Sequence, residues 1–73
     1  MSEPVFDVVL VALQDRVKIM QAIMSLTPVG LKGSKDMAGS PPAVVLKRVS
    51  RSKADEAKQV LERAGGTVEV RPS

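Results

Sequence analysis

The segment from Val5 to Val11, with the sequence VFDVVLV, is the feature that most limits how this chain can fold. It has the length of a strand, β-branched residues dominate it, and Asp7 is its only charge, so we predict a strand. Because nearly every position is apolar, rather than every second one, this strand must lie centrally in a sheet or be covered on both faces. The remaining elements must therefore supply its neighbours.

Three helices and two further strands are predicted from periodicity and from capping residues. Asp15 is placed to cap a helix from Arg16 to about Leu26, while Leu13 to Arg16 ends the first strand. Either Ser50 or Ser52 caps the third helix, and Ser52 with Asp55 resembles a capping box. The other predicted ranges are a helix over about 31–38, a strand over 43–49, a third helix that Gly65-Gly66 ends, and a strand over 67–70.

Core-forming faces are visible in the first and third helices. Apolar residues recur at helical spacing in both segments. The second predicted helix, over about 31–38, is interrupted by a glycine, Gly33. A glycine inside a helix lowers helix stability by on the order of 1 kcal/mol relative to alanine, so either tertiary contacts hold this helix or a partner needs the bare backbone at Gly33. The predicted core positions are Ile19, Ala22, Ile23 and Leu26, then Ala54, Ala57, Val60, Leu61 and Ala64.

The order strand, helix, helix, strand, helix, strand predicts an α+β fold. With about three strands in 73 residues, the economical arrangement is a two-layer sandwich with the helices on one face of a small three-stranded sheet. The other face would meet water or a partner. We expect one domain over residues 1–73, with its core at about 5–70, and we leave the strand order open.

Composition removes most function classes. The chain has no His and no Cys, its carboxylates are scattered, and the segment from Gly30 to Lys35 lacks the spacing of a phosphate-binding loop. We expect no enzyme, catalytic residue, metal or cofactor. No apolar run approaches the roughly 18 residues of a membrane span, and Met1 to Pro4 carries an acid where a signal peptide carries positive charge. We therefore expect a cytoplasmic protein.

The positive charge does not by itself indicate nucleic acid. Eleven Lys and Arg against eight Asp and Glu give +3, with a basic cluster of Lys47, Arg48, Arg51 and Lys53. Single-strand binding usually adds stacking aromatics, and the only aromatic is Phe6, which we expect to be buried. We interpret the cluster as a solvent-facing patch and expect no direct contact with nucleic acid.

Six short phrases occur in a fixed order along the chain: Phe6-Asp7-Val8-Val9-Leu10, Arg16-Val17-Lys18-Ile19, Gly30-Leu31-Lys32 with Lys35-Asp36, Val49-Ser50, Leu61-Glu62-Arg63-Ala64-Gly65 and Val68-Glu69-Val70. Together they resemble the C-terminal domain of the bacterial large-subunit ribosomal stalk protein. The resemblance covers about Val5 to Val70, and the family's fold has the element order predicted above.

The resemblance implies a binding module that captures translational GTPases through the exposed side of its first two helices. Physical reasoning agrees for Val17, Met20 and Met24, because the core face leaves them outside, although methionines at helical spacing are also typical of a core. The family typically has basic residues at Gln21 and Met24 and an acid at Gly33, so charge steering is weaker here. The residues implied for the partner surface are Arg16, Val17, Met20, Gln21, Met24, Gly30, Leu31, Lys32, Gly33 and Lys35.

Ribosomal members of the family also have an N-terminal anchor and a hinge, and these 73 residues resemble neither. If the sequence is complete, it is a free-standing relative, such as an adaptor or small structural subunit of a non-ribosomal complex. The protease adaptor ClpS, which shares the general fold, shows that this scaffold accepts other partners. If the sequence is instead a fragment of a longer protein, the ribosomal interpretation holds. The start at Met1 to Pro4 favours the free-standing relative, and the oligomeric state stays open.

Overall fold

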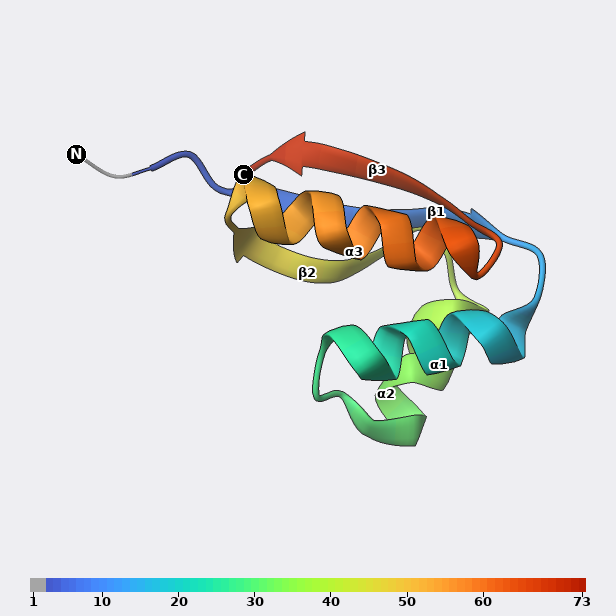
Figure 1. The fold of residues 1–73 in the computed structure, drawn as a ribbon. Coiled ribbons are helices and arrows are strands. Elements are labelled where there is room, and N and C mark those ends of the chain that lie inside the picture. The colour runs from blue at the N-terminus through green and yellow to red at the C-terminus, as the bar shows by residue number, and fades with distance from the viewer. Residues whose placement is uncertain (1–2) are drawn as a thin grey trace.

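Strand β1 (Phe6–Leu13) lies at the centre of the sheet, as its apolar sequence predicts. β2 (Ala43–Val49) and β3 (Gly66–Pro72) pair with it on either side, both antiparallel, in the order β2-β1-β3 (Figure 1). The computed structural model describes residues 3–73. The predictions that rest on residues 1–4 fall partly outside this range, because residues 1 and 2 are not described.

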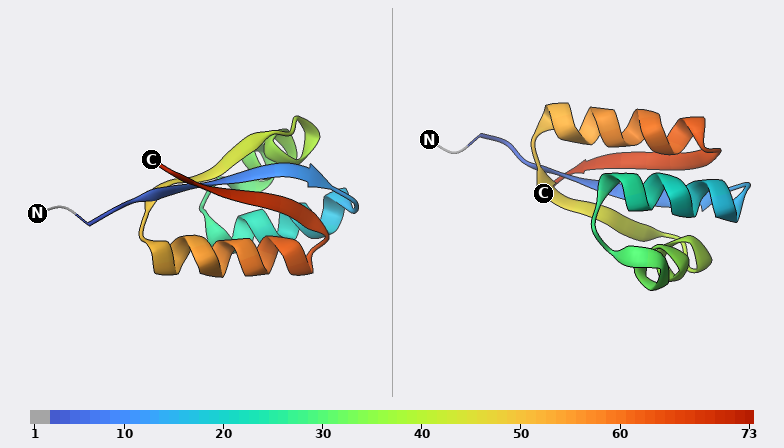
Figure 2. Two further views of the ribbon diagram at one scale, coloured as in Figure 1. Left: turned by 90° about the horizontal axis from the view of Figure 1, so that it is seen from above. Right: turned by 60° about the horizontal axis from the view of Figure 1, so that its bottom comes forward.

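The three helices cover one face of this sheet. α1 (Arg16–Leu26) and α3 (Arg51–Arg63) lie beside each other, and α2 (Gly30–Gly39) packs against α1 and reaches β2 (Figures 1 and 2). Within residues 3–73 the opposite face of the sheet has no helix over it (Figure 2). The predicted α+β sandwich, with its helices on one face of a three-stranded sheet, is confirmed.

The core joins the central strand to the two longer helices. Val8 and Leu10 of β1, Ile19 and Ile23 of α1 and Leu61 of α3 are all fully buried. The predicted helical core faces are confirmed, with Leu26, Val60 and Ala64 packed at their edges: Ile19, Ala22, Ile23, Ala54, Ala57 and Leu61 are buried.

The end of β1 and both ends of β3 differ from the prediction. β1 continues through Leu13 instead of ending before it, because Ala12 and Leu13 still pair with Thr67 and Gly66. β3 is correspondingly longer, from Gly66 to Pro72 rather than from 67 to 70. The long pairing between these two strands extends the sheet beyond the apolar run that marks it in the sequence.

Side-chain caps fix where α1 and α3 begin. Asp15 Oδ1 accepts a hydrogen bond from the Lys18 amide at 3.2 Å, which confirms the predicted cap of α1. Ser50 caps α3, since its Oγ accepts from the Lys53 amide at 3.2 Å. Ser52 lies inside α3, so the capping box predicted for it is wrong.

Phe6 is half-buried, and the prediction that it is buried is wrong. It lies at the first residue of β1, where its ring is covered by the Arg51 guanidinium, with Cζ 5.4 Å from the ring centroid. A cation over an aromatic face is attracted by the ring quadrupole. The ring therefore packs against the core cluster and is also covered by a charged side chain.

Two glycines shape the start of α2. Gly30 has a φ of 71°, in the left-handed region that favours glycine, and this turn brings Val29 over Gly33. A Cβ atom at Gly33 would lie 2.7 Å from Val29 Cβ. Packing within the chain therefore accounts for the missing side chain at position 33.

We predict that Gly33→Ala lowers the free energy of unfolding by about 1–3 kcal/mol, because the added methyl group displaces Val29. Gly39→Ala is the matched control, since Gly39 also lies in α2 but has nothing within 4 Å of an added Cβ. It should leave stability unchanged or raise it by up to about 1 kcal/mol. Urea denaturation of the two variants measures the difference, and equal effects would contradict the role given to Val29.

Candidate protein-binding surface

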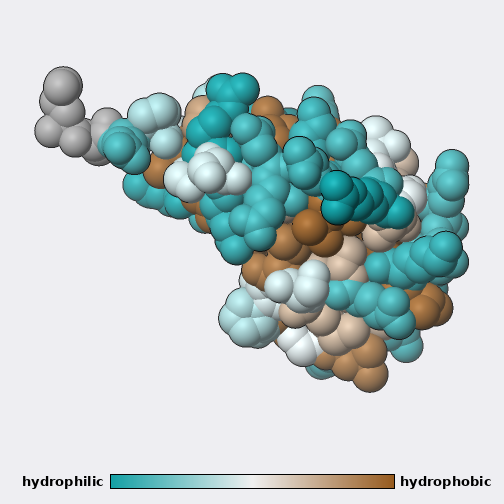
Figure 3. Space-filling view, in the orientation of Figure 1, coloured by the Kyte–Doolittle hydropathy of each residue, from teal (hydrophilic) through white to brown (hydrophobic). Residues whose placement is uncertain are grey.

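Exposed apolar side chains gather on the first two helices. Val17 (62% exposed), Met24 (38%) and Leu31 (65%) lie on α1 and α2. Within residues 3–73 one other large hydrophobic residue is exposed, Val44 (37%) on β2. Apolar surface reaches the outside of the molecule over α1 and α2 in Figure 3. Clustered exposed apolar groups are typical of interaction sites, whereas single ones are common anywhere on a surface.

The burial of Ile19 and Ile23 explains why α1 exposes Val17 and Met24. A helix with 3.6 residues per turn that buries those two positions must turn Val17 and Met24 away from the core. Met20 differs from expectation. It is half-buried and packs against the core instead of lying outside it, because its position borders the buried face.

α2 is held by its two buried residues, Ser34 and Ala38. The Ser34 hydroxyl donates to the Leu31 carbonyl at 2.9 Å, so this fully buried polar group is satisfied. The opposite side of the helix is exposed, and Gly33 is half-buried. We define the α1–α2 surface by the exposed residues on these helices that sequence reasoning selected: Arg16, Val17, Gln21, Met24, Gly30, Leu31, Lys32 and Lys35.

The α1–α2 surface is flanked by positive charge. Three of the residues that define it are cations, Arg16, Lys32 and Lys35, and none is a carboxylate. In the part of the chain that the structure describes, the ion pairs are Arg51 with Asp55 and Arg71 with Glu69, so none of these three cations is engaged. Unpaired cations around an apolar centre favour approach by a partner with acidic groups.

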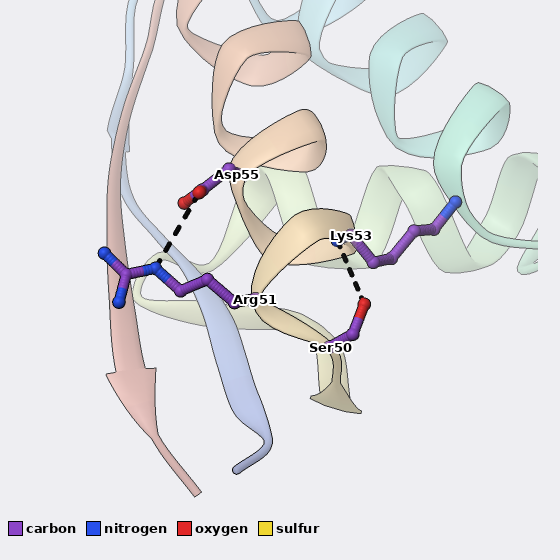
Figure 4. Close-up of polar contacts among 4 residues, drawn as sticks. All are labelled: Ser50, Arg51, Lys53 and Asp55. Carbon is purple, nitrogen blue, oxygen red and sulfur yellow. Dashed lines mark hydrogen bonds and ion pairs between the residues drawn. The ribbon is translucent and has the colours of Figure 1, made fainter. Parts of the chain in front are cut away.

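The basic cluster near the start of α3 is exposed, as expected, and part of it serves the fold. Arg51 Nε lies 3.7 Å from Asp55 Oδ2, and the Lys53 amide donates to Ser50 Oγ (Figure 4). The Arg51 guanidinium also covers the Phe6 ring. The Arg48 amide donates to Asp7 Oδ1 at 3.0 Å. Arg51 is therefore already in contact with other groups of this chain.

Sequence reasoning missed a groove between α1 and α3. Its lining comes from two helices that are far apart in the sequence, so no spacing along a single segment reveals it. The nearest signal was the pair Lys18 and Ala22, which lie one turn apart on the side of α1 that faces α3.

Two other kinds of site are absent from residues 3–73. These residues contain no group of three or more metal-ligating side chains placed to hold an ion. None of the described helices is both long enough and apolar enough to span a bilayer.

The fold and the α1–α2 surface together define a small α+β domain of the two-layer type with an exposed apolar side on two adjoining helices. Residues 6–71 match the family described as the ribosomal protein L7/L12 C-terminal domain. The chain belongs to this family, so the resemblance read from its six phrases is confirmed.

Curated relatives of the chain carry the name large ribosomal subunit protein bL12. The one from Nitrosococcus oceani is 42% identical over 67 residues, which cover 90% of this chain and 53% of the relative. Those from Macrococcus caseolyticus (43% over 67 residues) and Thermotoga maritima (41% over 70 residues) each align with 90% of this chain and 55% of their own length. The chain thus spans about half the length of the curated relatives it matches.

Met20 and Met24 give a direct test of the orientation of α1. We predict that Met20→Asp lowers the free energy of unfolding by about 1–3 kcal/mol, because it places a carboxylate against the core. Met24→Asp is the matched control, with the same residue types in the same helix, and should change stability by at most about 1 kcal/mol. Urea denaturation measures both, and equal losses would show that α1 is rotated differently.

Proposed function

We propose that this chain is a non-catalytic protein-binding module of a ribosomal stalk, and that its α1–α2 surface contacts a translational GTPase. The observation that carries this proposal is the placement of Val17, Met24 and Leu31 on two adjoining helices; within residues 3–73 they are three of the four exposed large hydrophobic residues. Membership in the L7/L12 C-terminal domain family supports the ribosomal part. The name of the relatives, large ribosomal subunit protein bL12, supports a place on ribosomes and therefore in the cytoplasm.

The apolar centre of the surface would supply most of the contact energy. Burying a Val or Leu side chain completely is worth about 1.5–3 kcal/mol relative to leaving it exposed. Val17 and Leu31 are both more than half exposed and would gain most of this on binding. A contact built on a few such residues is small and favours rapid release, which suits repeated capture of a partner.

The polar residues would set the approach of the partner. Arg16, Lys32 and Lys35 would attract an acidic region of the GTPase, while Gln21 offers a neutral hydrogen-bonding group. Gly30 would allow the partner to come close to the backbone, where no side chain of this chain intervenes within 4 Å. The proposed contact residues are Arg16, Val17, Met20, Gln21, Met24, Gly30, Leu31, Lys32 and Lys35, with Met20 taking part through its exposed portion.

A second candidate is an adaptor or small structural subunit of a non-ribosomal complex that uses the same surface. It is favoured by Gln21 and Met24, which are both exposed at positions where the family typically has cations. A neutral and apolar pair there suits a partner whose matching surface is less acidic.

We predict that the double variant Val17→Ser, Leu31→Ser binds a purified bacterial elongation-factor GTPase, loaded with a non-hydrolysable GTP analogue, at least about tenfold more weakly than the unchanged chain. Isothermal titration calorimetry measures the affinity. Val44→Ser is the control, because it removes an exposed apolar side chain from β2, outside the surface.

Two results would contradict the proposal. Equal weakening by Val44→Ser would show that the α1–α2 surface is not the contact. Absence of binding by the unchanged chain would remove the GTPase as partner and leave the adaptor candidate. Circular dichroism melts of each variant separate lost contact from lost fold.

A further inference from the structure

A groove of about 610 Å³ runs between α1 and α3, on a different side of α1 from Val17 and Met24. In Figure 3 it is visible as brown surface in the hollow between α3 above and α1 below, with teal side chains at its borders. α1 contributes Lys18, Gln21 and Ala22, and the end of α3 contributes Val60, Arg63 and Ala64. We call this the α1–α3 groove.

The floor of the groove is apolar and made of small side chains. Ala22 is buried, and Val60 and Ala64 are half-buried and pack against the core. Because these residues are short, the floor lies below the ends of the side chains that border it. An apolar side chain from outside could be seated there without displacing any core residue.

The borders of the groove carry charge of one sign. Lys18 and Arg63 are exposed, and the lining includes no carboxylate. Neither of these two cations takes part in the ion pairs found in residues 3–73, which join Arg51 to Asp55 and Arg71 to Glu69. The groove therefore combines an apolar floor with two uncompensated positive charges.

Lys18 is not explained by the stability of its own helix. It lies in the first turn of α1, which contains no acidic residue, and a cation there opposes the helix macrodipole. Arg63 lies in the last turn of α3, where a cation is favourable to the helix. Lys18 is thus the more informative of the two, because its charge has no local role.

We propose that the α1–α3 groove binds an acidic amphipathic segment of a partner protein. One apolar side chain of the segment would lie over Ala22, Val60 and Ala64, and flanking carboxylates would pair with Lys18 and Arg63. Charge complementarity selects an acidic segment, and the apolar floor selects a peptide over a nucleic acid, since the lining offers no aromatic ring on which a base could stack. This site is separate from the proposed GTPase contact and shares only Gln21 with it.

A titration followed by nuclear magnetic resonance tests the proposal. The probe is a synthetic 12-residue acidic peptide with leucines at two positions one helical turn apart and glutamates at most others, added to the ¹⁵N-labelled chain. We expect the largest amide shift changes at Lys18, Ala22, Val60, Arg63 and Ala64. A peptide with the same leucines, and lysines in place of the glutamates, should bind at least about tenfold more weakly. Added salt should lower the affinity of the chain for the acidic peptide.

Matched variants locate the charge that matters. Lys18→Glu should lower the affinity for the acidic peptide at least about tenfold. The melting temperature should stay unchanged or rise, because an acid is favourable in the first turn of α1. Lys32→Glu is the control. Lys32 is likewise exposed and is the third residue of its helix, but it lies outside the groove, so binding should stay within about twofold of the unchanged chain.

Other outcomes would overturn the proposal. Shift changes centred on Val17 and Leu31, or loss of binding in Lys32→Glu but not in Lys18→Glu, would place the peptide on the α1–α2 surface. Stronger binding by a single-stranded RNA at the same amides would replace the peptide with a nucleic acid. Failure of the GTPase titration leaves these results unaffected, so the two proposals fail separately.

Discussion

The contact among Leu10, Ile19 and Leu61 beside Gly66 is the constraint on which the rest of the molecule depends. All three side chains are fully buried, and they come from β1, α1 and α3. A Cβ atom at Gly66 would lie 2.9 Å from Ile19 Cδ1 and 3.0 Å from both Leu10 Cδ1 and the Leu61 carbonyl oxygen. The absence of a side chain at the first residue of β3 therefore lets the strand pass directly over this junction.

This junction fixes the rotation of α1, and α1 in turn is the element that both proposed sites share. With Ile19 held against Leu10 and Leu61, Val17 must point away from the core and Lys18 must lie toward α3. A single helix thus contributes an apolar contact on one side and a charged border on another. The fully buried residues have no direct part in either site, but they decide which side chains are available to a partner.

Much of this arrangement could be predicted from the sequence. The spacing of Ile19 and Ile23, and the dense apolar run of β1, are strong signals because burial leaves few alternatives for such patterns. Membership in the family was also readable, because six phrases kept their order and spacing. These features depend on single segments, which is why one sequence is enough to show them.

What could not be predicted depends on contacts between segments. Ser50 and Ser52 satisfy the local capping pattern about equally well, and the choice follows from β2, whose last residue Val49 still pairs with Phe6. Met20 borders the core face, so its burial depends on packing that periodicity does not specify. The covering of Gly33 by Val29 requires the positive φ of Gly30, and the α1–α3 groove requires two helices to meet.

The central claim is that α1 and α2 form the face that meets a translational GTPase, and a cross-saturation measurement tests it most directly. The chain would be labelled with ²H and ¹⁵N and mixed with an unlabelled elongation-factor GTPase bound to a non-hydrolysable GTP analogue. The account predicts that irradiation of the GTPase lowers amide intensities most at Val17, Met24 and Leu31. Losses centred instead on Val44 and Glu69, which are exposed on the sheet, would contradict it.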